Sequence, residues 1–206
     1  IINLLEARIN VLEKSLMNSL STSLYSDGTG SSGKEVGGLQ LIVADAGTGT
    51  VGGINSSTYT FWQNAQTTAT SSAFSVANVQ TDMNTIYLSL VRGADSPDLV
   101  MAGTNAYTAF LGSLQAIQRI TSDDLANSGF TSLQYLNSDV VFDSACNTNR
   151  MYFLNTDYLR LEVAASRDFV PGEAKMSVNQ DAMVTPMFWS GNLTCSNRAL
   201  QGVIHT

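Results

Sequence analysis

Two glycine-rich stretches are the part of this sequence whose spacing comes nearest to a chemical motif. Residues 28–33 match the dinucleotide-binding pattern G-x-G-x-x-G, and residues 28–34 match most of the phosphate loop G-x-x-x-x-G-K. Both motifs need a strand before the glycine turn and a helix after it, because the helix N-terminus then faces the phosphate. This stretch instead follows a predicted helix, and Glu35 stands where the phosphate loop needs a magnesium-binding hydroxyl. We therefore predict a helix cap and a turn rather than a nucleotide site.

The second stretch, residues 47–52, matches the dinucleotide pattern again and follows a strand-like run. Residues 55–62 have no helical period, however, and no acidic residue lies about 20 positions further on to bind a ribose. A structural turn is the better interpretation of this stretch as well.

The titratable residues form no catalytic constellation. His205 is the only histidine, and a lone histidine provides neither an assisted general base nor a metal cluster. Asp123 and Asp124 are the nearest approach to a carboxylate pair, and solvated charges or a helix cap explain them. Four further aspartates are isolated in the sequence: Asp143, Asp157, Asp168 and Asp181. The sequence therefore predicts no catalytic, cofactor-binding or metal-ligating residue, no cofactor and no enzyme activity.

Composition excludes several classes of protein. The 206 residues carry a net charge of −7 without any run of basic residues, which argues against direct binding of nucleic acid. No apolar run approaches the roughly 18 residues of a membrane-spanning helix. Only 13% of the residues are charged, and neutral polar residues suit a β-rich or assembling protein. Cys146 and Cys195 are predicted to be free thiols of a reducing compartment.

The elements that would position these residues follow from hydrophobic spacing. Apolar residues three or four apart predict helices over residues 1–25, 79–91 and 105–120. Loops are predicted over residues 26–37 and 63–75, and a glycine-rich turn over residues 45–53. Residues 122–129 are predicted to form a loop or one helical turn, and residues 168–172 a turn. A short buried strand or extended segment is predicted over residues 38–44. Strands are predicted over residues 98–102, 132–136, 139–143, 151–154, 158–165, 182–189, 193–195 and 199–204. Helices come early and strands late, so an α+β fold is favoured over alternating α/β.

The first helix has consequences for packing and for the chain boundary. It begins at Ile1 without a capping residue, so we expect this chain to be a fragment of a longer one. Its apolar stripe is expected to pack Leu12 and Leu16 on the terminal strands. Trp62 and Trp189 are expected to be at least partly buried.

Several segments, taken in order, resemble the major capsid proteins of tailed bacteriophages with the Hong Kong 97 fold. Among them are the first helix with its YSDGTG turn, MYFLNTDYL and the closing run SVNQDAMVTPMFWSGNLTCSNRALQGVI. The resembling segments are residues 1–30, 37–45, 47–54, 61–64, 113–124, 151–159 and 177–204. Each alone is short, but the ordered set covers nearly the whole chain.

The resemblance implies a division of the chain. Residues 1–96 would hold the long spine helix and part of a peripheral domain, with the glycine-rich loops. Residues 97–165 would form the axial domain, a central sheet with helices. Residues 166–206 would return as strands to the peripheral domain. The family's N-terminal arm and extended loop are not found in this sequence, so no cross-linking residue is assigned and the chain by itself is expected to stay monomeric or form small oligomers.

The resemblance also implies a function and partners. The protein would be a structural capsid protein that assembles with itself into pentamers and hexamers of an icosahedral shell enclosing phage DNA. Scaffold, portal and protease would be further partners, DNA would be contacted only indirectly, and no membrane would be involved. The location would be the virion capsid, after synthesis in the bacterial cytoplasm. The alternative is an encapsulin-type shell of a cellular protein compartment, and an enzyme is a more distant third reading.

Overall fold

A six-stranded mixed sheet forms the centre of the molecule in the computed structural model, which describes residues 4–114, 133–178 and 183–206. Its strands, in spatial order, are β3 (Ala65–Thr68), β14 (Gly202–His205), β7 (Arg150–Leu154), β4 (Leu99–Ala102), β6 (Ser138–Phe142) and β5 (Leu133–Tyr135). The pairs β14–β3 and β4–β6 are parallel, and the other neighbours are antiparallel. The predicted strands at residues 98–102, 132–136, 139–143 and 151–154 are thereby confirmed.

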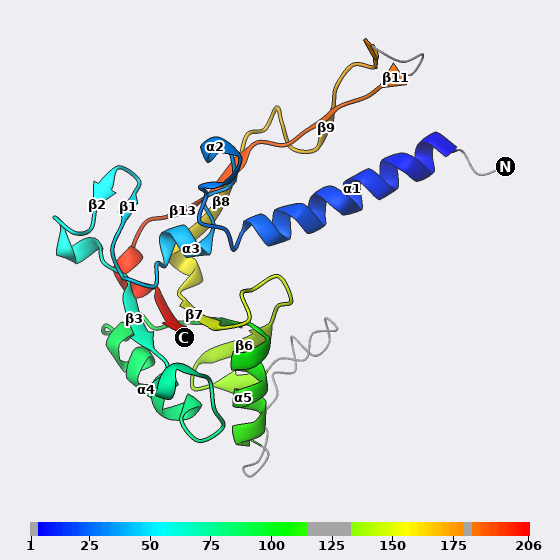
Figure 1. Ribbon diagram of the computed structural model, residues 1–206. Coiled ribbons are helices and arrows are strands. Elements are labelled where there is room, and N and C mark those ends of the chain that lie inside the picture. The colour runs from blue at the N-terminus through cyan, green and yellow to red at the C-terminus, as the bar shows by residue number, and fades with distance from the viewer. Residues whose placement is uncertain (1–3, 115–132, 179–182) are drawn as a thin grey trace.

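Two helices cover one face of this sheet, α4 (Val79–Leu90) and α5 (Thr104–Leu114) (Figure 1). The buried side chains of α4 recur every three or four residues, so they share one face of the helix. With α5 and the strands they form the first core, which includes Val79, Met83, Ile86, Leu90, Val100, Ala106, Phe110, Val140, Met151, Phe153 and Ile204. The predicted helix over residues 79–91 is confirmed. The predicted helix over residues 105–120 is confirmed as far as Leu114, and its remainder lies outside the described residues.

A second core lies on the opposite face of the sheet. It consists of Tyr25, Leu39, Ile42, Val43, Cys146, Tyr152, Leu154 and Val203. Strand β7 supplies both cores, because successive side chains of a strand point to opposite faces. The short helix α3 (Leu39–Ile42) covers this face, so the strand predicted over residues 38–44 is wrong. A short apolar run does not distinguish a buried strand from a buried helical turn by periodicity.

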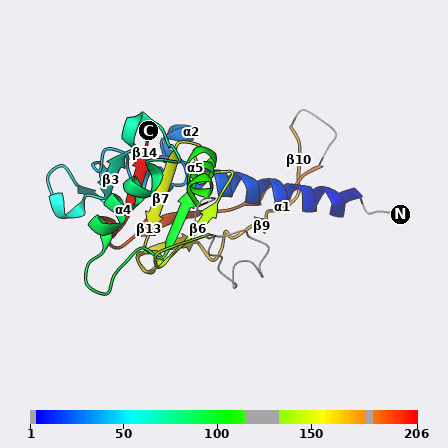
Figure 2. The same cartoon turned by 90° about the horizontal axis from the view of Figure 1, so that it is seen from below.

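An elongated arm extends from this body. It contains α1 (Leu4–Ser23) and a long antiparallel ribbon that run outward in the same direction (Figures 1 and 2). The ribbon pairs β8 (Leu159–Val163) with β13 (Gly191–Cys195), β9 (Val170–Pro171) with β12 (Met187–Phe188), and β10 (Lys175–Met176) with β11 (Met183–Val184). The first predicted helix is confirmed over residues 4–23. The turn predicted over residues 168–172 contains strand β9 instead.

A small lobe protrudes at the end of the molecule opposite to the arm (Figure 1). It contains the hairpin of β1 (Thr50–Val51) and β2 (Ile54–Asn55), followed by the 3-10 turn η1 (Thr60–Trp62). The remaining short elements are α2 (Gly30–Gly33), η2 (Thr70–Ser72), η3 (Thr156–Tyr158) and η4 (Arg198–Leu200).

The sheet edge after the lobe differs from the prediction. Residues 63–75 are not simply a loop, because β3 lies within them and pairs in parallel with β14. The central sheet therefore combines strands from all three predicted segments of the chain. The assignment of those segments to peripheral and axial domains stays a prediction.

Candidate functional site

The first glycine-rich stretch forms a tight turn after α1 in the structure. Ser31 and Ser32 adopt left-handed backbone angles, with φ of 50° and 60°, inside the four-residue α2. The Ser26 hydroxyl donates to the Val36 carbonyl at 2.8 Å and closes the turn. No long helix begins here to present an N-terminus to a phosphate. The structure therefore agrees with a turn, and the lack of nucleotide binding stays a prediction.

The second glycine-rich stretch leads into the β1–β2 hairpin rather than into a helix. Gly47, Gly49 and Gly52 have φ of 68°, 130° and 61°, a region that glycine occupies without steric cost. At Gly47 a side chain would also lie 3.1 Å from the Asn64 carbonyl. These glycines are explained by backbone geometry, as the sequence predicted.

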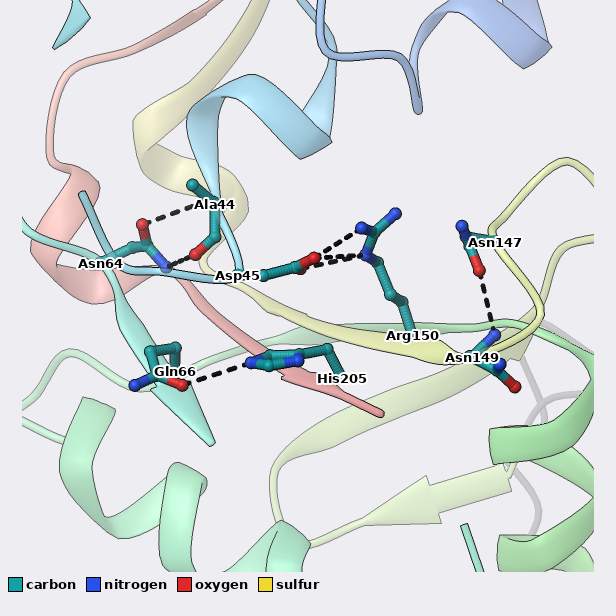
Figure 3. A network of polar contacts seen from close by, with 8 residues as sticks. All are labelled: Ala44, Asp45, Asn64, Gln66, Asn147, Asn149, Arg150 and His205. Atoms are coloured by element: carbon teal, nitrogen blue, oxygen red, sulfur yellow. Dashed lines mark hydrogen bonds and ion pairs between the residues drawn. The ribbon is translucent and has the colours of Figure 1, made fainter. Parts of the chain in front are cut away.

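A polar network lies where β7, β14 and β3 meet the loop after α3 (Figure 3). The Arg150 guanidinium donates to the Asp45 carboxylate from Nε at 3.0 Å and from Nη2 at 2.5 Å. Burial by itself would lower the pKa of Arg150, but the hydrogen bonds with Asp45 and neighbouring charges raise it overall. His205 lies at the edge of this network, with its Nε2 3.3 Å from Gln66 Oε1. The network joins loop and sheet and contains no nucleophile.

The other predicted titratable residues are dispersed. Asp143 accepts a hydrogen bond from the Tyr25 hydroxyl at 2.7 Å, whereas Asp168 is exposed on the ribbon. Asp157 lies in η3, where its backbone NH donates to the Asn155 side chain. Asp123, Asp124 and Asp181 lie outside the described residues. Within the described ranges, no group of three or more His, Cys, Asp or Glu side chains could hold a metal ion.

The two cysteines are free, as predicted. Burial raises the pKa of the Cys146 thiol to about 12, and the neighbouring Asp143 carboxylate adds to the rise. Burial likewise raises the pKa of Cys195. Since the thiolate is the reactive form of cysteine, neither thiol has the environment of a nucleophile. No helix among the described residues is long and apolar enough to cross a membrane.

Arg198 is the polar residue that sequence reasoning missed. Its side chain is fully buried, and no carboxylate pairs with it in the described part of the chain. The guanidinium instead donates to the Ile42 carbonyl, to Ser56 Oγ at 3.0 Å and to the Thr48 carbonyl at 3.2 Å. Burial lowers its pKa. Arg198 thus fixes α3 and the base of the lobe to η4, which is a structural role.

The arm carries much of the exposed apolar surface. Val11 and Met17 on α1 are 68% and 57% exposed, and Met176 and Met183 at the ribbon tip are similarly exposed. Leu16 is half-buried beside a groove that Phe169, Met187 and Trp189 also line, as expected for contact with the terminal strands. Leu12, which was predicted to pack there too, is exposed. Trp62 and Trp189 are partly buried, as predicted. Apolar surface of this extent on a projecting element is typical of an interaction surface.

Comparison with known proteins shows the fold of this chain. No protein-family profile and no curated protein matches the sequence. A solved chain from the cyanophage A-1(L) capsid asymmetric unit superposes with a TM-score of 0.69 and 17% sequence identity, over 97% of this chain and 66% of that chain. A chain of a virus-like particle from Pyrococcus furiosus gives a TM-score of 0.40 and 9% identity, over 61% of this chain and 48% of the other.

The chain therefore has a mixed α+β fold similar to that of a phage capsid protein, which confirms the fold class that the resemblance implied. It spans about two thirds of the length of the cyanophage chain.

Proposed function

We propose that this protein is a structural capsid protein that assembles with copies of itself into the shell of a tailed bacteriophage. The observation that carries the proposal is the superposition on the cyanophage capsid chain over 97% of the residues. Among the described residues, no group of three or more His, Cys, Asp or Glu side chains could hold a metal ion, and burial raises the pKa of the Cys146 thiol. The sequence has a single histidine, His205. The proposed role is mechanical, and it rests on the capsid-like fold rather than on these absences.

The shape of the molecule suits repeated contacts between copies. The body has two buried cores, whereas α1 and the ribbon extend outward (Figure 2). Val11, Met17, Met176 and Met183 on these elements are exposed. An extended element that leaves its own body can lie on a neighbouring body, and such head-to-tail contacts generate rings. Pentamers and hexamers of a shell are rings of this kind.

The arm and the body are assigned to the two domains of the capsid fold. We assign α1 and the part of the ribbon that follows residue 165 to the peripheral domain. Residues 97–165, which include β8, are assigned with the central sheet to the axial domain. The pairing of β3 and β14 with β7 extends that sheet beyond the segment 97–165. Residues 166–206 would then run along the peripheral domain before β14 enters the axial domain.

Partners follow from this role. The shell would enclose phage DNA and touch it only indirectly, which agrees with the net charge of −7. We propose a scaffold, a portal and a protease as further partners of such a shell. The protein would be made in the bacterial cytoplasm and end in the virion capsid.

The experiment that tests the proposal is expression of the full-length protein with and without a phage scaffold protein, followed by electron microscopy. Closed particles of uniform size are expected, and they should package DNA only when portal and packaging proteins are present. A protein that stays monomeric at high concentration with its scaffold would refute the proposal. Particles that form without phage proteins and enclose a specific enzyme would instead establish the encapsulin-type alternative.

A variant sharpens this experiment. Met183 at the ribbon tip and Leu88 on α4 are 72% and 73% exposed, so a glutamate at either position leaves the cores intact. Met183→Glu is expected to prevent closed particles, because it places a charge on the arm surface. Leu88→Glu controls for the added charge itself.

A further inference from the structure

The lobe has an unusual composition for an exposed part of an acidic protein. Residues 46–81 contain no Asp, Glu, Lys or Arg, although the chain has a net charge of −7. Residues 46–63, which we call the aromatic lobe, present two exposed rings. Tyr59 is 52% and Phe61 69% exposed, and their ring centroids lie 6.0 Å apart. Uncharged surface with exposed aromatic residues is the composition of the centre of a protein–protein interface.

The aromatic lobe is held rigidly. Arg198 binds its two sides, at Thr48 and Ser56, and the Ser56 hydroxyl donates to the Gly49 carbonyl at 3.0 Å. The Gln63 side chain donates to the Ser56 carbonyl at 3.0 Å. A surface that is ordered before binding loses less conformational entropy on association. The buried arginine therefore has a use beyond stability, because it keeps the aromatic rings in place.

A complementary surface lies on the body beneath the C-terminal end of α1. We call it the sheet groove, a cavity of about 300 Å³ that is lined largely by apolar side chains, several of them leucines of β4, β8 and β13. Its lining residues include Leu24, Leu99, Met101, Leu159, Leu161 and Leu193. Asp143 and Arg160 are its charged lining residues and balance each other. An apolar cavity of roughly 150 Å³ holds one benzene ring, so the sheet groove has room for about two rings.

The two surfaces do not meet within one chain. The aromatic lobe protrudes at the end of the molecule opposite to the free end of α1, and it points away from the arm (Figures 1 and 2). Two copies that each carry a charge of −7 repel one another, so their closest contact is least costly where both surfaces are neutral. The aromatic lobe and the sheet groove both meet that requirement.

We propose that the aromatic lobe of one copy docks in the sheet groove of the next copy, with Tyr59 and Phe61 as its anchors. The contact is heterologous, because it joins two different surfaces, and repetition of it around an axis closes a ring. This inference rests on the proposed shell function and adds which surfaces meet within a ring.

Site-specific cross-linking tests the proposal in particles of the full-length protein. Phe61→Cys and Leu161→Cys are placed in separate copies that differ in tag length, both in a Cys195→Ser background, and are assembled together. A short bis-maleimide is expected to join the two kinds of copy into a heterodimer. The matched control pairs Phe61→Cys with Leu88→Cys, which is exposed on α4 outside the groove.

The outcomes separate this contact from the proposed function. If particles form but the Phe61–Leu161 pair cross-links no better than the control, the contact is wrong while the shell function stands. If no particles form at all, the proposed function itself fails. Maleimide labelling of Leu161→Cys in dissociated monomers gives a second check. Blocked labelling there would show that the chain covers its own groove, which also overturns the proposed contact.

Discussion

Replacing Arg198 by methionine is the sharpest test of how the aromatic lobe is held. Methionine keeps most of the side-chain volume but donates no hydrogen bond. The backbone carbonyls of Ile42 and Thr48 and the hydroxyl oxygen of Ser56 then lose the hydrogen bonds that they accept from the guanidinium. A buried acceptor left unpaired costs ~1–3 kcal/mol.

The opposing effect is the cost of burying the guanidinium, which amounts to several kcal/mol in principle and is removed in the variant. Against this relief stands the loss of a hydrogen-bond donor at two backbone carbonyls, those of Ile42 and Thr48, which stay in the variant. We therefore expect Arg198→Met to lower the free energy of unfolding by ~2–4 kcal/mol. The free energy of unfolding of Arg198→Lys should lie between those of the parent and Arg198→Met, because an ammonium group cannot reach three dispersed acceptors as a planar guanidinium does.

Tryptophan fluorescence during urea unfolding provides the assay. Trp62 belongs to η1, which packs against η4 where Arg198 lies, so its emission reports on the lobe. Trp189 on the arm is replaced by phenylalanine to remove the second signal. The Arg198→Met variant should unfold at lower urea, and proteolysis within residues 47–53 should become faster.

One result would refute this reasoning. A free energy of unfolding within about 0.5 kcal/mol of the parent, or above it, would mean that relief of charge burial outweighs the lost hydrogen bonds. Unchanged proteolysis in the lobe would then also remove the argument that Arg198 preorganises it.

Three further changes have expected outcomes. Burial raises the pKa of Cys146 from an ordinary 9.0 to about 12, so the folded protein keeps this proton and loses stability as the pH rises above 9. Between pH 8 and pH 10, the free energy of unfolding by urea should therefore fall by ~1.4 kcal/mol less in Cys146→Ala than in the parent. A thiol reagent should modify Cys195 before the buried Cys146 in the native protein. Leu16→Ala should lower the free energy of unfolding by ~1–2 kcal/mol because Leu16 is half-buried. Leu12→Ala should lower it by under about 0.5 kcal/mol because Leu12 is exposed. Equal losses of stability in thermal unfolding would contradict this difference in burial. Lys34→Ala should leave folding unchanged, and calorimetry should detect no ATP binding to either protein, so a micromolar dissociation constant abolished by the substitution would disprove the turn interpretation.

Long periodic segments could be predicted because their information is local. In α4 the residues Val79, Met83, Ile86 and Leu90 recur at helical spacing and are all buried, so the pattern and the packing agree. The same holds for β7, whose alternate side chains enter the two cores. The resemblance to capsid proteins, carried by an ordered set of segments, then gave the fold class.

Elements that depend on distant partners could not be predicted in the same way. Strand β3 contains only Ala, Gln and Thr, and it becomes a strand because β14, more than 130 residues later, pairs with it in parallel. Polar residues are tolerated there because β3 is an edge strand with one exposed side. The burial of Arg198 is a similar case, since its three acceptors lie about 140 to 160 residues away and none is acidic. No local pattern marks such a residue.

The distribution of buried residues explains why the arm and the body should behave differently. The body is stabilised by two cores that share the strands of one sheet, so its elements unfold together. The arm has no comparable core, because the described side chains of α1 and of β9 to β12 are half-buried or exposed. Elements with few buried contacts open at low free-energy cost and gain stability when a partner covers them. In the proposed shell, contacts between copies would therefore stabilise the arm much more than the body.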